Sequence, residues 1–195
     1  MRRRAALATV TVLALVVAAC TSPPARFYTL SATAAPVATA SRVSVVVGPV
    51  AVPAAVDRPQ IVVNTSANQV TLDEFHRWAA PLQDTLVRVV AEDLVALLGT
   101  PRVSLYPQPL NAEVDYRVQI EIRNFESVPG NAASLDAFWT VRRNRDGRIE
   151  TGRSSVREPL PDTSYDALAA AHSRGIARMS QDIAEAVRAL ERPGS

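Results

Sequence analysis

Apolar and polar residues alternate strictly in the clearest predicted strand of the chain. Between Val114 and Arg123 each apolar side chain is followed by a polar or charged one. One face of this strand should therefore be buried and the other should face water. Residues 135–141 repeat the alternation, and Asp146-Gly147 marks a turn into residues 149–156. These three segments predict an antiparallel meander.

Apolar positions spaced three and four residues apart predict two long helices. The first covers residues 81–99, with a proline in its first turn and a glycine at its end. The second covers residues 164–190, and its apolar stripe includes His172. Either Thr163 or Ser164 could cap the start of this second helix.

Five short apolar segments bounded by polar or turn-forming residues are predicted as strands: 27–30, 43–47, 61–63, 70–72 and 103–105. The valine-rich run 43–47 should be buried and should end at Gly48-Pro49. The segments 61–63 and 70–72 flank a polar stretch, which predicts a hairpin. Together with the meander and the helices, these strands predict one α/β domain with a mixed, partly antiparallel sheet.

Residues 1–19 predict a secretion signal. Three arginines precede an uncharged stretch of about 15 residues, which is shorter than the roughly 20 that a transmembrane helix needs. The stretch ends in Val17-Ala18-Ala19-Cys20, a sequence similar to a bacterial lipobox. An ordinary signal peptide with a chance cysteine is the alternative. Because Cys20 is the single cysteine of the chain and stands at this position, we expect it to carry the lipid.

Lipid attachment at Cys20 would anchor the mature protein permanently, because several acyl chains are buried together. Thr21 stands where an aspartate resembles an inner-membrane retention signal in enteric bacteria. A threonine in place of that aspartate favours the outer membrane, on the periplasmic face. Residues 31–41 are rich in alanine, threonine and proline and lack charge. We therefore interpret residues 20–41 as a lipid-anchored segment and tether or surface loop, and residues 42–192 as a single periplasmic domain.

Composition excludes several classes of function. All 21 basic residues are arginine, so Schiff-base chemistry on lysine and Walker-type phosphate binding are excluded. One cysteine and two histidines exclude a disulfide scaffold and a cysteine-based zinc cluster. Without residues 1–19, 18 arginines face 19 acidic residues, which leaves a side-chain charge of −1. This balance gives no electrostatic reason to expect a nucleic-acid partner.

The sequence offers little material for catalysis. His76 has no second histidine within a helical turn, and His172 is about a hundred residues away. We expect both to be structural histidines and predict no metal site. The adjacent Asp73-Glu74 pair precedes the first helix, where solvated or capping carboxylates are common. No nucleophile elbow or glycine-rich phosphate loop is present. We predict a protein that is not an enzyme and has no cofactor besides the lipid on Cys20.

Two short motifs remain as candidates for partner binding or scaffolding, and they contain Asp57, Arg58, Pro59, Gln60, Arg77 and Trp78. The charged pair of the first motif could pin the loop by an ion pair. Alternatively, it could present Arg58 to a partner or a lipid headgroup. The second motif lies just before the first helix. Trp78 could belong to the core or could act as a partner-facing anchor.

Five motifs follow one another along nearly the whole mature chain: Phe27-Tyr28-Thr29-Leu30, Gly48-Pro49-Val50, residues 57–62, residues 77–82 and residues 179–184. In this order after a lipobox, they resemble the PqiC family, the auxiliary lipoproteins of MCE-type ABC transport systems. Ala80 replaces the glutamate of the family's Arg-Trp-Ala-Glu-Pro-Leu pattern, so any ion pair of that acid is lost. Residues 54–56 lack the aromatic residue often found there. The resemblance implies a three-layer α/β domain similar to the anticodon-binding class.

The same resemblance implies a role at the outer membrane. Such lipoproteins dock a periplasm-spanning MCE protein and help lipids to move between the two membranes, with energy from an inner-membrane ATPase. A homo-oligomer around the partner is compatible with this role. Two alternatives remain: a stand-alone envelope-assembly lipoprotein without a transporter, and a tethered periplasmic hydrolase. The missing nucleophile–base motifs argue against the hydrolase.

Overall fold

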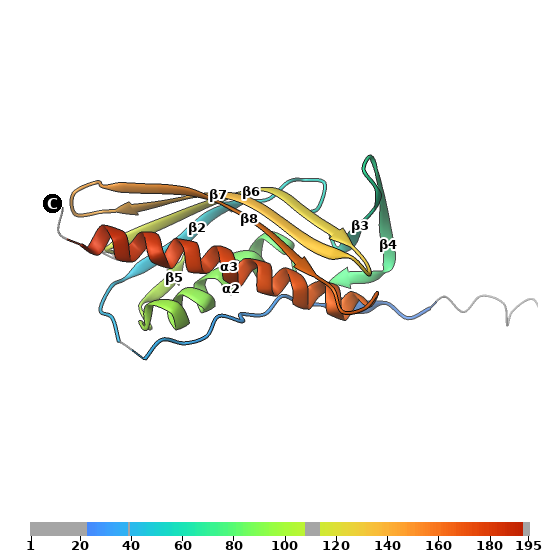
Figure 1. Ribbon diagram of the computed structural model, residues 1–195, viewed down its shortest axis with the longest axis horizontal. Coiled ribbons are helices and arrows are strands. Elements are labelled where there is room, and N and C mark those ends of the chain that lie inside the picture. Colours follow the sequence, from blue (N-terminus) through green and yellow to red (C-terminus); the bar gives the residue numbers. More distant parts are fainter. Residues whose placement is uncertain (1–22, 39, 108–113, 193–195) are drawn as a thin grey trace, which may run out of the picture.

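A computed structural model describes residues 23–38, 40–107 and 114–192 of the chain. Cys20 and the residues before it lie outside this part. The described residues form eight strands and two helices (Figure 1): β1 (Arg26–Tyr28), β2 (Val45–Ala51), β3 (Gln60–Ser66), β4 (Gln69–Trp78), α2 (Leu82–Leu98), β5 (Val103–Leu105), β6 (Tyr116–Val128), β7 (Ala132–Arg143), β8 (Ile149–Pro159) and α3 (Tyr165–Glu191). The predicted strands and both predicted helices are present.

The strands form two sheets. The five-stranded sheet has the order β5-β2-β6-β7-β8. In this sheet β2 is parallel to β5 and β6, and β6, β7 and β8 form the predicted antiparallel meander. The three-stranded sheet has the order β1-β4-β3, with β1 parallel and β3 antiparallel to β4. Both sheets are mixed, which confirms the predicted α/β class.

Strand β6 shows how the alternation is used. Tyr116, Val118, Ile120 and Ile122 are buried, and the residues between them are exposed. Helices α2 and α3 pack side by side on the buried face of the five-stranded sheet (Figure 1). The opposite face of β6 is polar. In the described residues the pair of helices thus covers one face of this sheet. The three-stranded sheet closes one end.

Both helices begin and end where the sequence predicted. Helix α2 follows Pro81 and ends at Gly99, whose φ of 62° lies in the left-handed region that favours glycine. Helix α3 is capped by Ser164, whose hydroxyl accepts the N–H of Ala167 at 3.1 Å. With 27 residues, α3 is about 40 Å long and follows the long axis of the molecule (Figure 1). Neither helix has a stretch apolar and long enough to cross a bilayer.

Several strands extend beyond their predicted ends, and β2 and β4 are the two cases that change the interpretation of a motif. Strand β2 continues past Gly48-Pro49 to Ala51, because a bulge lets its pairing with β6 resume at Val50. Strand β4 continues to Trp78, so Asp73-Glu74 lies within a strand. We had expected this pair to lie directly ahead of the first helix. The pairing of β4 with β3 is irregular between Asp73 and Arg77. A regular alternation of apolar and polar residues therefore does not continue to the end of this strand, and the sequence pattern did not reveal it.

Candidate functional site

The two motifs singled out in the sequence lie side by side across β3 and β4. Gln60 is the register partner of Arg77. The N–H of Trp78 donates to the carbonyl oxygen of Pro59 at 2.7 Å. The side chains of Gln60 and Arg77 both donate to the carboxylate of Glu74, at 3.4 and 3.3 Å. The fold therefore joins two motifs that are separate in the sequence into one surface region.

Trp78 lies in the core. Its side chain is 6% exposed and packs edge-on against Phe125 and His172, with ring centroids 6.4 and 6.5 Å away. Burial of an indole contributes a large apolar area to the core. Of the two alternatives for Trp78, the structure agrees with the core position, from which this residue holds the end of β4 in place.

Arg58 and Asp57 lie in the loop that leads into β3. No ion pair joins them in the part of the chain that the structure describes. The loop is held by its backbone: the N–H of Asp57 donates to Pro53 at 3.1 Å and that of Arg58 to Val56 at 2.9 Å. The Nε of Arg58 is buried and has no hydrogen-bond partner. A buried donor without an acceptor costs about 1–3 kcal/mol.

An aromatic stack joins β1, β4 and α3 at this end of the molecule. The ring of His76 stacks on Tyr28 and Tyr165, with centroids 5.5 and 3.9 Å away. The Tyr28 hydroxyl lies 2.7 Å from Nδ1 of His76, and the Tyr165 hydroxyl donates to Asp73 at 2.7 Å. Burial, together with the hydrogen bond to Asp73, raises the pKa of Tyr165 above its usual value. Tyr165 therefore remains protonated and donates this hydrogen bond. The cluster joins the three-stranded sheet to the start of α3.

His172 is enclosed by the core. Its ring lies parallel to Phe125 with centroids 3.9 Å apart, and its Nε2 is 2.9 Å from the Ser127 hydroxyl. Burial lowers the pKa of His172 to about 3, so the ring is neutral at physiological pH. These contacts agree with the structural role predicted for both histidines. Within residues 23–38, 40–107 and 114–192, no group of three or more potential ligands is placed to hold a metal ion.

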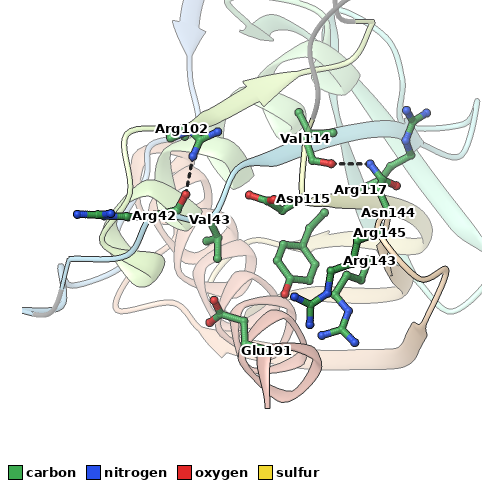
Figure 2. A pocket seen from close by; sticks show the side chains of 11 residues that line it. Arg42, Val43, Arg102, Val114, Asp115, Arg117, Arg143, Asn144, Arg145 and Glu191 are labelled. Carbon is green, nitrogen blue, oxygen red and sulfur yellow. Dashed lines mark hydrogen bonds between the residues drawn. The ribbon is translucent and has the colours of Figure 1, made fainter. Parts of the chain in front are cut away.

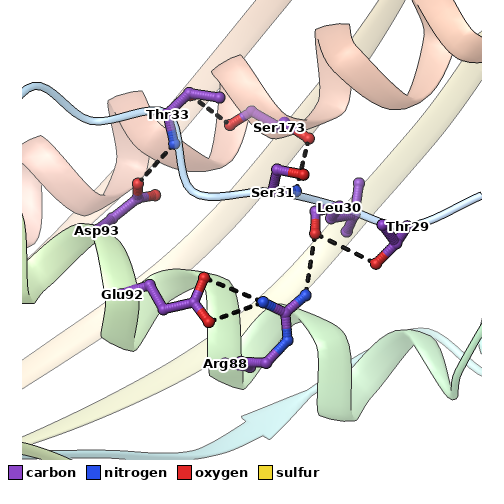
Figure 3. A network of polar contacts seen from close by, with 8 residues as sticks. All are labelled: Thr29, Leu30, Ser31, Thr33, Arg88, Glu92, Asp93 and Ser173. Carbon is purple, nitrogen blue, oxygen red and sulfur yellow. Dashed lines mark hydrogen bonds and ion pairs between the residues drawn. The ribbon is translucent and has the colours of Figure 1, made fainter.

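The segment between β1 and β2 crosses both helices and is bound to each of them (Figure 3). The N–H groups of Thr33 and Ala34 both donate to Oδ1 of Asp93 on α2, each at 3.0 Å. The N–H of Ser31 donates to the hydroxyl of Ser173 on α3 at 3.1 Å. Residues 31–34 are therefore held on the surface of the helix pair.

Two further contacts fix the start of this segment. Leu30 is fully buried, and its carbonyl oxygen accepts a hydrogen bond from Arg88 at 3.0 Å. Arg88 also forms an ion pair with Glu92 at 2.8 Å (Figure 3). Asp93 is fully buried, and this burial raises the pKa of its carboxyl group. The sequence showed only an uncharged loop here, because the bonds of this segment to Asp93 and to the Ser173 hydroxyl come from backbone N–H groups, which every residue except proline has.

An open pocket of about 790 Å³ lies at the opposite end of α3 (Figure 2), and its lining contains five arginines: Arg42, Arg102, Arg117, Arg143 and Arg145. Arg143 is buried, pairs with Asp146 and donates to the carbonyl oxygen of Leu190. Arg42 lies on the opposite side of the pocket from Arg143 (Figure 2). The guanidinium groups do not converge on one point, and the most buried of them holds the end of α3. The sequence analysis missed this pocket, although Arg142-Arg143-Asn144-Arg145 was a local signal for it.

Comparison with known protein families identifies the class of protein. The family described as "ABC-type transport auxiliary lipoprotein component" matches residues 28–184. This match covers most of the chain, from the last residue of β1 through strands β2 to β8 and into most of α3. The chain therefore belongs to this family. No curated protein sequence gives a significant match.

Solved structures share the fold at low sequence identity. A crystal structure of an uncharacterized protein has a TM-score of 0.69 at 20% identity, covering 85% of this chain and 99% of its own. A Xanthomonas campestris protein assigned to family DUF330 has a TM-score of 0.65 at 20% identity, covering 81% and 92%. A PelC dodecamer from Paraburkholderia phytofirmans gives a TM-score of 0.42 at 13% identity, covering 77% and 90%. The first two similarities show the fold alone.

Proposed function

We propose that this auxiliary lipoprotein is an adaptor held by a lipid on Cys20 at the periplasmic face of the outer membrane. There it docks an MCE-type protein of the transport system, and this system moves lipids between the two membranes and supports envelope integrity. Membership of the auxiliary lipoprotein family supports the connection to an ABC-type transporter. The lipobox-like sequence before Cys20 supports the anchor, and Thr21 favours the outer membrane.

One observation carries this proposal: the segment that follows the anchor is fixed to the fold. Cys20 precedes Arg26 of β1 by six residues, a distance of at most about 20 Å even in a fully extended chain. After β1, residues 31–34 are bonded to both helices. An anchor on Cys20 therefore holds the domain close to the membrane surface. A docking protein needs such a defined position, whereas a diffusing enzyme does not.

The loop residues Asp57, Arg58 and Pro59 are the docking positions that we propose, and Gln60, the register partner of Arg77, belongs to the scaffold. Arg58 supports this choice, because its side chain is partly exposed and a guanidinium can pair with a carboxylate of the partner. Arg77 and Trp78 have the role of a scaffold, since Arg77 pairs with Gln60 in the register and Trp78 bonds Pro59. We propose no catalytic activity and no cofactor.

Purification from the native envelope tests this proposal. Tagged, lipidated protein would be isolated in a gentle detergent, and its partners would be identified by mass spectrometry. We expect an MCE protein together with its permease and ATPase. Cys20→Ala should lose these partners, because the anchor no longer places the docking site. Arg58→Glu should weaken recovery of the MCE protein, while Arg142→Glu, at an exposed arginine at the other end of α3, should not.

The stand-alone envelope-assembly lipoprotein is the alternative. Recovery of outer-membrane assembly proteins alone, or of no partner at all, would favour it over the transport adaptor. A panel of esterase and phosphatase substrates separates both from a tethered hydrolase. Turnover of any of these substrates by the purified protein would contradict the non-enzymatic assignment.

A further inference from the structure

We infer that the three-stranded sheet lies with its outer face on the lipid surface that holds the anchor. The exposed apolar side chains of this outer face are Phe27, Val70, Leu72 and Phe75. The inference rests on the proposed lipid anchor at Cys20 and adds a second, non-covalent contact with the membrane. That contact would set the orientation of the domain, which the anchor alone does not determine.

Register and strand alternation assign these residues to one face. Ile61 and Val63 of β3 belong to the core, so Val62 points the other way. Leu72 is the register partner of Val62. Val70 is two residues before Leu72 and therefore shares its face. These three apolar residues thus lie on the side of the hairpin that faces away from the core.

The same reasoning applies to β1 and the end of β4. Trp78 points into the core, so Arg77 and Phe75 point away from it. Phe27 is the register partner of Arg77. The register of β4 with β3 shifts between Asp73 and Arg77, and beyond this shift the outward side chains are those of Phe75, Arg77 and Phe27. Arg77 lies on the central strand, between Phe27 of β1 and Gln60 of β3, and its charge is balanced by an ion pair with Glu74 at 3.3 Å.

Large apolar side chains are exposed on this face. The exposed fraction is 64% for Phe27, 54% for Val70, 39% for Phe75 and 38% for Leu72. Exposed apolar side chains that gather on one small element mark an interaction surface more often than isolated ones do. Val62 lies on the same face but is itself buried, so it supports the exposed side chains from beneath.

Absence of charge distinguishes this hairpin from the rest of the surface. Residues 59–72 contain no Asp, Glu, Arg or Lys, although charged residues make up 21% of the chain. The polar side chains between the strands are neutral: asparagine, glutamine, threonine and serine. Moving a charge out of water is costly, whereas these neutral groups are compatible with the headgroup region of a bilayer.

The position of the anchor selects lipid as the occupant of this face. The first described residues lead into β1, which is itself one of the three strands. They lie at the same end of the molecule as this sheet (Figure 1). Six residues join Cys20 to Arg26, and residues 20–25 contain no charge. A lipid on Cys20 is therefore held within about 20 Å of the outer face. The membrane is the apolar surface that this tether brings to the sheet.

This orientation has a consequence for the opposite end. Helix α3 begins beside His76 of the three-stranded sheet and ends beside Arg143 of the arginine-lined pocket. The pocket would then stand about 40 Å from the membrane-facing end, if α3 rises from the surface along its length. Ile149, 55% exposed near the same end, is a matched reference position away from the lipid.

Depth-dependent fluorescence quenching tests this inference. Lipidated full-length protein with Val70→Cys or Ile149→Cys would be labelled with a polarity-sensitive dye and placed on phosphatidylethanolamine–phosphatidylglycerol vesicles. The lipid occupies the thiol of Cys20, so only the introduced cysteine reacts. With nitroxide-labelled lipid in the vesicles, we expect quenching at position 70 to exceed that at position 149 by roughly twofold or more. A blue shift of the dye at position 70 alone should accompany it.

The outcomes separate the orientation from the anchor. Co-flotation of the protein with vesicles reports on the anchor independently of the dye. If the protein floats but both positions are quenched equally, the anchor stands and the orientation is overturned. If the dye at position 70 is shielded without lipid and in a manner that depends on protein concentration, a second copy covers the face and the inference is again overturned. If the protein does not float, the anchor proposal fails and the orientation fails with it.

Discussion

The carboxylate of Asp93 accepts the backbone N–H of Thr33 at 3.0 Å, although the two residues are 60 positions apart in the sequence. This bond joins helix α2 to the segment that leads from the N-terminal strand into the domain. Oδ1 of Asp93 also accepts the N–H of Ala34, and Oδ2 accepts the hydroxyl of Ser180 on α3 at 3.3 Å. One buried carboxylate thus connects the segment and both helices.

Replacing Asp93 should release this segment. Asp93→Ala leaves the N–H groups of Thr33 and Ala34 without their acceptor, so we expect a loss of about 1–3 kcal/mol in the free energy of unfolding. Hydrogen exchange at these two amides should accelerate. Asp93→Asn keeps one oxygen acceptor and should have a smaller effect on both measurements. Unchanged exchange at Thr33 and Ala34 in Asp93→Ala would contradict the assigned role of Asp93.

His172 should make stability depend on pH. Its pKa in the folded protein is about 3, below the 6.5 of an unfolded chain, because it is buried. Below pH 6.5 the unfolded state gains a proton that the folded state does not accept. The stabilisation is therefore complete above pH 6.5 and is lost as the pH falls toward 3, with a slope approaching about 1.4 kcal/mol per pH unit.

The His172 contribution can be isolated by comparison with His172→Gln. The variant should be less stable at every pH, because it loses the stacking on Phe125. Its unfolding free energy between pH 7.5 and 4.5, measured in urea, should nevertheless fall less steeply than that of the wild type. Other titrating groups are common to both proteins and cancel in the difference. Parallel curves would show that His172 takes up a proton in the folded protein as readily as in the unfolded chain, which contradicts the lowered pKa.

Two neighbouring arginines of the pocket should behave differently. Arg143 is buried, pairs with Asp146 and bonds the carbonyl oxygen of Leu190, so Arg143→Gln should destabilise the protein by about 1.5–3 kcal/mol. Arg145 is exposed, and Arg145→Gln should change stability by no more than about 0.5 kcal/mol. Thermal or urea unfolding of the two variants gives the comparison. Equal losses would mean that the end of α3 does not depend on Arg143.

Gly152 provides space for Trp139 on the neighbouring strand. A Cβ at position 152 would lie 2.2 Å from the indole, and the indole N–H donates to Ser154 at 3.0 Å. Gly152→Ala should force this ring to move and should cost about 1–3 kcal/mol of stability. Near-ultraviolet circular dichroism should report the changed environment of the tryptophan. Gly147→Ala, at a turn with little contact, should leave that spectrum unchanged even though its positive φ makes the substitution strained.

The sequence predicted those helices and strands that depend on residues close together in the chain. The alternation in β6, the proline and glycine around α2, and the serine cap of α3 each depend on residues within one element, and each prediction was confirmed. Strand pairing across long separations was not accessible in this way. The parallel pairing of Arg26–Tyr28 with His76–Trp78 depends on tertiary packing and leaves no periodic signal in either segment.

The candidate site was found in part for the same reason. Pro59, Gln60, Arg77 and Trp78 stood out as motifs, and the fold brings them together. The stack of Tyr28, His76 and Tyr165 combines residues that are far apart in the sequence. Asp93 accepts hydrogen bonds from backbone N–H groups, which carry no sequence signal. Neither leaves a local pattern, so neither could be predicted from the sequence.

The central claim is that this auxiliary lipoprotein works within a transport system and not beside it. Genetic epistasis in the source organism tests this claim most directly. Envelope permeability to a detergent would be measured after deletion of this gene, of the MCE gene, and of both. The adaptor account predicts that the double deletion is no more permeable than the more affected single deletion. An additive defect in the double deletion would contradict the account and would identify an envelope factor that acts independently of the transporter.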